Sequence, residues 1–166
     1  MKVNIGGYPD YQYWLDRFFG WNPKQKINVR IDPQDTWSMD YTLAHIITPM
    51  LVQLKETKHG APSVDDADVP KELRMTRKQR KQLSVDGTVD DNHFARWNWI
   101  LDEMIWAFEQ KSREDWDGDF YEYEQDDTEQ FGVRLVWEDK EGAKAHQERM
   151  SNGFRLFGRY YENLWD

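Results

Sequence analysis

Apolar residues recur at intervals of three and four along three long stretches of the chain, a spacing that predicts three main helices. The first stretch runs from Asp35 to Leu54; Asp35 or Thr36 is suited to cap its start, and Gly60 marks its end. Pro49 is expected to kink it, because proline lacks a backbone donor. Apolar residues surround most of its circumference, so we expect this helix to form the centre of the fold. They are Leu43, Ile46, Ile47, Met50, Leu51 and Leu54, with Trp37, Tyr41, Ala44 and Val52 beside them.

Two further helices are predicted, one at residues 92–111 and one that begins after Asp139. The helix at 92–111 has Asp90 or Asp91 as a candidate cap and is expected to pack directly on the first helix. Its apolar stripe contains Phe94, Trp97, Leu101, Met104, Ile105 and Phe108, with Trp99 and Trp106 on the flank. The stripe of the last helix contains Ala143, His146, Met150, Gly153, Phe157, Tyr160 and Leu164.

Shorter stretches alternate between apolar and polar residues, which is typical of strands. Lys2–Ile5 is one such stretch, and in residues 26–31 the isoleucines and valine share one face, which predicts a half-buried strand. Between them, residues 11–19 have the spacing of a short amphipathic helix. Residues 120–123 and 131–137 predict a hairpin, with residues 125–130 at its tip. Together these elements predict an α+β fold with three main aromatic-rich packed helices and a small antiparallel sheet or hairpin.

Residues 60–89 lack a clear pattern and are expected to form a long loop, within one domain that spans residues 1–166. Six basic residues occur between Lys71 and Lys81, where either a short exposed helix or a disordered excursion fits the sequence. This basic run suits two roles equally. It would bind nucleic acid, or it would neutralise the acidic segment at 112–141 within the fold.

The charge of the chain is unevenly distributed. The formal net charge is -9, and between Ser112 and Glu141 twelve acidic residues face three basic ones, so the remainder is neutral. A dense anionic segment repels nucleic acid, but it can imitate a phosphate backbone and occupy the basic groove of a host protein. The simpler interpretation is a solvated segment that keeps the protein soluble.

The amino-acid composition further limits the kinds of site and protein that are expected. The absence of cysteine excludes disulfides and thiolate metal sites, while nine Trp, eight Tyr and eight Phe supply large apolar surfaces for a core. No apolar run approaches the length of a membrane helix, and no secretory signal is visible at the N-terminus. We therefore expect a soluble, cytoplasmic protein without a membrane partner.

Three blocks of the sequence resemble a family of uncharacterised proteins encoded by tailed bacteriophages. They read DTWSMDYTLAHIITPMLVQLKETKHGAPSVDDADVP at 35–70, RWNWILDEMIWAFEQ at 96–110 and GFRLFGRYYENLWD at 153–166. That family has no established activity. The resemblance implies a phage origin and a place of action inside the host cell, and it assigns no catalytic residue.

A set of arginines and aromatic residues is the first candidate site. Arginine holds phosphate through two hydrogen bonds and aromatic rings stack on bases, so the set predicts a site for a nucleotide-type ligand. Tryptophan at helical spacing is more often part of a core, which is the competing interpretation. The predicted ligand-binding residues are Trp37, Arg96, Trp99, Arg149, Arg155, Arg159 and Tyr160, with Trp97 and Tyr161 nearby.

Carboxylates and histidines form a second candidate site, for a divalent metal. Asp102 and Glu103 interrupt an apolar helix, and a buried carboxylate requires compensation by a metal, an arginine or water. The competing interpretation is that they pair with Arg96 or with helix amides, or that they face solvent. The proposed ligands are Asp40, His45, Asp102 and Glu103, with His59 and His93 as further members. Asp115–Asp119 also resembles a calcium loop, but its glycine is misplaced and no closing Glu follows, so a charged turn fits better.

The sequence therefore favours a non-enzymatic phage accessory protein that binds a host factor or a nucleotide-type signalling molecule, with a possible role against host defence. A metal-dependent phosphohydrolase or nuclease is the first alternative, and a virion or assembly component is the second. No cofactor is expected unless the metal alternative holds. Aromatic residues near the C-terminus, Tyr160, Tyr161 and Trp165, also allow a homodimer if they are exposed.

Overall fold

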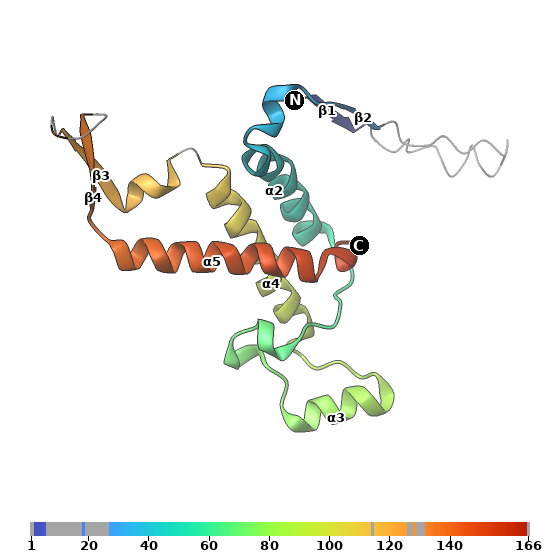
Figure 1. The fold of residues 1–166 in the computed structure, drawn as a ribbon. Coiled ribbons are helices and arrows are strands. Elements are labelled where there is room, and N and C mark those ends of the chain that lie inside the picture. Colours follow the sequence, from blue (N-terminus) through green and yellow to red (C-terminus); the bar gives the residue numbers. More distant parts are fainter. Residues whose placement is uncertain are drawn as a thin grey trace. The chain divides into compact units, whose positions relative to one another are not determined.

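The computed structural model describes residues 2–5, 18, 27–113, 115–125, 128 and 132–165 (Figure 1). These residues form helices and two antiparallel strand pairs, which confirms the predicted α+β fold. Contacts within the chain divide it into two compact units, Met1–Thr42 and Leu43–Asp166. The expectation of one domain stays a prediction. Among the described residues, no helix combines the length and the apolar composition needed to cross a membrane.

The first unit contains the strand pair β1 (Lys2–Ile5) and β2 (Ile27–Arg30). The strands run antiparallel, with Lys2 opposite Arg30. The expectation of a half-buried second strand is wrong, because Ile27, Val29 and Ile31 are all more than half exposed. The amphipathic helix expected at 11–19 lies outside the described residues, except for Phe18.

The central helix of the second unit is α4 (His93–Lys111), which is buried over nine of its positions. Its apolar stripe faces the core as predicted, apart from Phe94, which is exposed. Its closest helical partner is α5 (Lys140–Arg159), which begins at the predicted cap, where the Asp139 carboxylate accepts from the Gly142 amide at 2.8 Å. A short turn, η5 (Tyr161–Asn163), follows α5.

A glycine lets α4 and α5 approach each other closely. A Cβ atom placed on Gly153 of α5 would overlap the Cβ of Ala107 and lie 2.6 Å from the carbonyl oxygen of Glu103. Both distances are shorter than van der Waals contact allows, so the two helices can pack this closely only because residue 153 is a glycine.

Helix α2 (Met39–Thr57) continues through Pro49, but it does not form the centre of the fold as predicted. A short turn, η1 (Pro33–Thr36), comes before it. Ala44 and Leu51 are its buried residues, whereas Leu43 and Met50 are exposed. The prediction failed because an apolar pattern shows which positions can be buried, and it does not show which neighbours cover them.

Residues 58–90 are more ordered than the sequence indicated. They contain two short turns, η2 (Asp66–Asp68) and η3 (Lys71–Leu73), and a helix, α3 (Arg77–Asp86). Val64 and Val69 anchor the segment in the core beside α4 and α5. Of the two structures proposed for the basic run, the exposed helix is the one observed.

The acidic segment forms the predicted hairpin. Its strands are β3 (Tyr121–Gln125) and β4 (Val133–Trp137), preceded by a turn, η4 (Trp116–Asp119). The strands are antiparallel, with Tyr121 opposite Trp137 and Gln125 opposite Val133. The amides of Glu138 and Asp139 donate to the Phe120 carbonyl and close the base of the hairpin.

Candidate functional site

The arginines predicted to hold a phosphate form ion pairs with carboxylates of the chain. Arg155 donates from Nη2 to Oδ1 of Asp68 at 2.8 Å, and Nε of Arg159 lies 3.0 Å from Oδ2 of the same carboxylate. Nη2 of Arg159 also donates to Asp65 at 2.8 Å. The side chain of Asp68 is 3% exposed, so two guanidinium groups compensate one buried negative charge.

Tyr160 completes this cluster and is buried, which corrects the expectation that it is exposed, whereas Tyr161 and Trp165 are exposed as expected. Its hydroxyl donates to Oδ2 of Asp68 at 2.8 Å and accepts from the Asp65 amide at 3.1 Å. Burial is the main cause that raises the pKa of the Tyr160 hydroxyl above its ordinary value of 10.0. These hydrogen bonds and ion pairs therefore hold the η2 segment against α5.

The other predicted ligand-binding residues are not part of this cluster, and those in the second unit lie elsewhere in that unit. Trp37 belongs to the first unit and is 90% exposed, and Trp99 packs against the core. Arg149 donates to the Glu103 carboxylate at 2.7 and 3.1 Å, and its guanidinium lies 4.0 Å from the centre of the Trp106 ring. The structure thus brings together Arg155, Arg159 and Tyr160, and their role in ligand binding stays a prediction.

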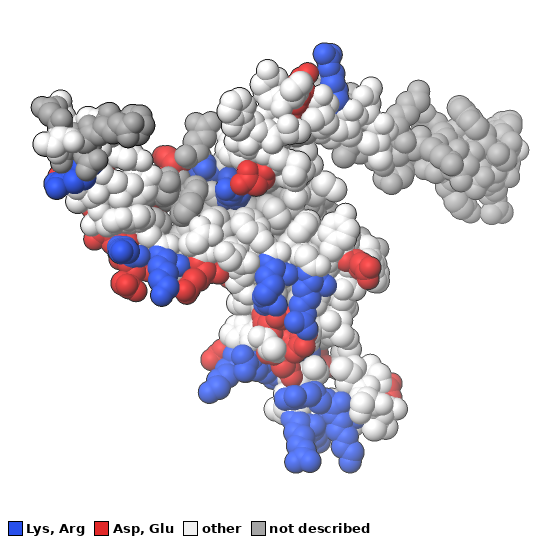
Figure 2. Space-filling model, in the orientation of Figure 1, with Lys and Arg blue, Asp and Glu red and all other residues white. Residues whose placement is uncertain are grey.

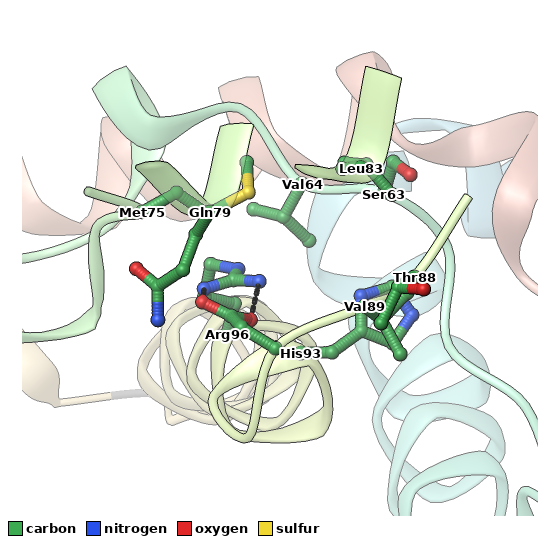
Figure 3. Close-up of a pocket in the computed structure, with 10 residues that line it drawn as sticks. Ser63, Val64, Met75, Gln79, Leu83, Thr88, Val89, His93 and Arg96 are labelled. Atoms are coloured by element: carbon green, nitrogen blue, oxygen red, sulfur yellow. Dashed lines mark hydrogen bonds and ion pairs between the residues drawn. The ribbon is translucent and has the colours of Figure 1, made fainter. Parts of the chain in front are cut away.

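Arg96 lies in a different place, beside a small pocket (Figure 3). Its guanidinium forms two hydrogen bonds with the Asp90 carboxylate, and Nη1 also donates to the Leu73 carbonyl at 3.0 Å. Asp90 was expected to cap α4, but the N-cap is Asn92, and Asp90 pairs with Arg96. That hydrogen-bonded guanidinium is the main cause that lowers the pKa of Asp90 below 3.8.

The pocket beside Arg96 has a volume of about 10 Å³, which is room for about one water molecule. Side chains from α3, α4 and the segments next to them surround it in Figure 3. The lining residues are Ser63, Val64, Met75, Gln79, Leu83, Thr88, Val89, Asp90, His93 and Arg96. A nucleotide does not fit this pocket as it stands.

Two of the proposed metal ligands, Asp102 and Glu103, are engaged in separate ion pairs. Asp102 pairs with Lys55 of α2, and Glu103 pairs with Arg149 of α5, so neither carboxylate pairs with Arg96 as one interpretation expected. Asp40 and His45 lie on α2. Within the described part of the chain, no three His, Asp or Glu side chains are grouped so that they could hold a metal ion. The metal alternative stays a prediction.

The segment that resembles a calcium loop folds as a charged turn. Arg113 donates to both carboxylate oxygens of Asp119, at 3.0 and 3.2 Å, and lies 3.8 Å from the Asp115 carboxylate. These contacts neutralise part of the acidic segment locally. Two residues of the basic run at 71–81 contact groups outside the acidic segment. Arg80 pairs with Asp66, and Arg74 donates to the Val69 carbonyl.

The β3–β4 hairpin presents an apolar face that the sequence analysis did not single out. Residues directly opposite in an antiparallel pair share a face, and alternate residues along each strand share it too. The register therefore places an aromatic and aliphatic set, together with Gln125, on one face and Glu122, Glu124, Arg134 and Val136 on the other. We call the first set the hairpin face; it consists of Tyr121, Tyr123, Val133, Leu135 and Trp137.

The hairpin face remains open to solvent. Tyr123 is 64% exposed and Trp137 is 47% exposed, although the ring of Tyr121 contacts both at centroid distances of 5.3 and 5.4 Å. Exposed apolar patches of this kind mark interaction sites. The alternation of both strands was visible in the sequence, but the face becomes apparent only when the register is known.

His146 connects the base of the hairpin to the helices. Its ring packs on Trp106 of α4 at 4.9 Å and on Phe120 at 5.3 Å, and Nε2 donates to Oε1 of Gln110 at 3.1 Å. Burial is the main cause that lowers the pKa of His146 below 6.5. The nearby charges oppose one another, since Asp119 raises this pKa whereas Arg113 and Arg149 lower it.

The stability of this junction is expected to depend on pH. Because the folded state disfavours the imidazolium, the unfolded chain binds a proton more readily, and stability is lost as pH falls below 6.5. We expect the free energy of unfolding, measured with urea between about pH 7 and pH 5, to decrease in the wild type. The decrease should be smaller in His146→Phe, which cannot titrate. Equal slopes for the two proteins would contradict this assignment.

Comparisons with known proteins give no independent guide to function. No protein family model matches this chain, and no curated protein or solved structure is significantly similar to it. The phage resemblance therefore stays a prediction, and the functional argument rests on the described residues.

Proposed function

We propose that this protein is a phage accessory protein that acts in the host cytoplasm by binding a basic host protein through the hairpin face. The observation that carries this proposal is the open apolar face of β3 and β4. A two-stranded hairpin is at best marginally stable alone in water, so a partner that covers one face would also stabilise it. Tyr and Trp are enriched where protein interfaces are most deeply buried.

The charge around the hairpin face indicates the chemistry of the partner. Exposed carboxylates lie on the opposite face and at the base of the hairpin; they are Asp115, Asp119, Glu122, Glu124, Glu138, Asp139 and Glu141. Arg113 pairs with Asp115 and Asp119, and Arg134 pairs with Glu124, so these carboxylates outnumber the two arginines that pair with them. Such a rim attracts a cationic surface and accelerates its association. A second copy of the same hairpin would carry the same negative rim, which disfavours self-association through this face.

Two further observations support a protein partner over a nucleotide-type ligand or a metal-dependent reaction. Arg155 and Arg159 compensate aspartates within the fold, and the pocket beside Arg96 has room for about one water molecule. The carboxylates Asp102 and Glu103 are held in ion pairs with Lys55 and Arg149. A ligand or metal at any of these groups would first have to break those contacts.

Site-specific crosslinking tests the proposal. A photo-crosslinking amino acid at position 123 should capture a partner in infected host cells, and mass spectrometry should identify that partner as a basic protein. With the purified partner, Tyr123→Ser/Trp137→Ser should weaken binding by more than about tenfold, because aromatic anchors at interfaces contribute about 2 kcal/mol or more.

The matched control is Tyr161→Ser/Trp165→Ser. It removes the same two residue types from exposed positions near the C-terminus, 65% and 62% exposed, and should leave the affinity within about twofold of the wild type. An acidic crosslinked partner would overturn the proposal. So would equal losses of affinity in the two double variants.

A further inference from the structure

Helix α3 is fixed at its ends and along its inner side. Thr76 and Gln79 form a capping box, in which Oγ1 of Thr76 accepts from the Gln79 amide and Oε1 of Gln79 accepts from the Thr76 amide. At the other end Gly87 has φ of +74°, and its amide donates to the Leu83 carbonyl. Gln79 and Leu83 line the small pocket beside Arg96. The rest of the helix faces solvent.

The outer side of α3 carries a group of basic residues that the fold does not neutralise. Arg77, Lys78 and Lys81 are exposed, and none of the three forms an ion pair within the part of the chain that the structure describes. Arg80 differs, because it pairs with Asp66. Figure 2 shows Lys and Arg side chains gathered over this helix at the lower end of the view.

These three cations do not stabilise the helix that carries them. Arg77 and Lys78 lie in its first turn, where the helix dipole is positive and an acidic residue would be favourable, yet the first turn contains no acid. Residues three and four positions apart are neighbours on a helix surface, so both Arg77 and Lys78 lie beside Lys81. The result is a concentrated positive surface on a chain whose net charge is -9.

We propose that this outer side of α3 binds the phosphate backbone of a nucleic acid. Lysine is depleted in protein interfaces and aromatic residues are enriched there, whereas α3 carries lysines and no aromatic residue. Interfaces with DNA are more polar and more positively charged than those between proteins. This site is independent of the hairpin face, and its failure would leave the hairpin proposal untouched.

The size of the surface sets the expected strength of binding. With about three phosphate contacts, the affinity should fall with salt, with a slope of about -3 in log K against log salt concentration for a duplex. Phosphate contacts carry no sequence information, so different sequences should bind alike. Binding should therefore be measurable at low ionic strength and weak at physiological salt.

The test uses fluorescence anisotropy with a short labelled DNA duplex and a single strand of the same length. Lys78→Gln/Lys81→Gln should weaken binding about tenfold or more at low salt, and it should reduce the salt slope by about 2. The control, Lys140→Gln/Lys144→Gln, removes the same charge from exposed positions near the start of α5 and should change binding less than about twofold.

Three results would overturn the proposal. The first is that the wild type binds neither DNA at low salt. The second is that the two double variants weaken binding equally, which would indicate nonspecific attraction by any lysine. The third is that labelled poly-glutamate binds as tightly as DNA, which would make α3 a docking surface for an acidic protein. All four substituted lysines are exposed, so each variant should keep the thermal unfolding temperature of the wild type.

Discussion

Replacing Gly153 with Ala should destabilise the protein, although alanine is the better helix former. The new Cβ would overlap the side chain of Ala107 and lie 2.6 Å from a backbone oxygen of Glu103, so α4 and α5 would have to move apart. Overpacking a tight core costs about 1–3 kcal/mol, and helix propensity returns at most about 1 kcal/mol. We expect a net loss of about 1 kcal/mol in the free energy of unfolding measured with urea.

Gly158→Ala is the matched control in the same helix. Nothing lies within 4 Å of the Cβ position at Gly158, so the substitution should gain about 0.5–1 kcal/mol from helix propensity alone. The two variants should therefore change stability in opposite directions. A stabilised Gly153→Ala protein would show that the helices do not meet at this residue.

The local elements of this fold could be predicted from the sequence, but their partners could not. The periodicity of α4 and α5 and the cap at Asp139 depend on residues close together in the chain. Which helix lies at the centre depends on which helix faces pack against each other, and no local sequence pattern shows that. The broad apolar face of α2 led to the wrong centre, whereas Gly153, where α5 approaches α4, looked like an ordinary stripe position.

The candidate site shows the same limit. Arg155 and Asp68 are 87 positions apart, and Arg149 and Glu103 are 46 positions apart, so no local pattern reveals that these charges compensate one another. Residue types alone made the arginines look available for a phosphate. For the hairpin, both alternating strands were recognised, and the missing step was the register that gathers their apolar residues on one face.

The ion pair between Asp90 and Arg96 is expected to contribute more to stability than any exposed pair among the described residues. The side chains are 5% and 2% exposed, so Asp90→Asn would leave a buried guanidinium without its counter-charge. Removing one partner of a buried pair typically costs about 3–5 kcal/mol. Glu124→Gln is the control, because its pair with Arg134 is more than half exposed, and such pairs contribute less than about 1 kcal/mol. Urea unfolding at neutral pH measures both changes.

The difference in the free energy of unfolding between the wild type and Asp90→Asn should disappear in acid. The hydrogen bonds from Arg96 lower the pKa of Asp90 below 3.8, so the folded state holds the carboxylate ionised at a pH where the unfolded chain begins to bind a proton. The contribution of the pair is therefore complete above this value and is lost as pH falls through the lowered pKa. The gap in stability between the two proteins should begin to narrow as pH falls below 3.8 and should close only once the pH is below the lowered pKa of Asp90. A gap that persists unchanged in acid would mean that the loss comes from packing around the substituted amide rather than from the charge of Asp90.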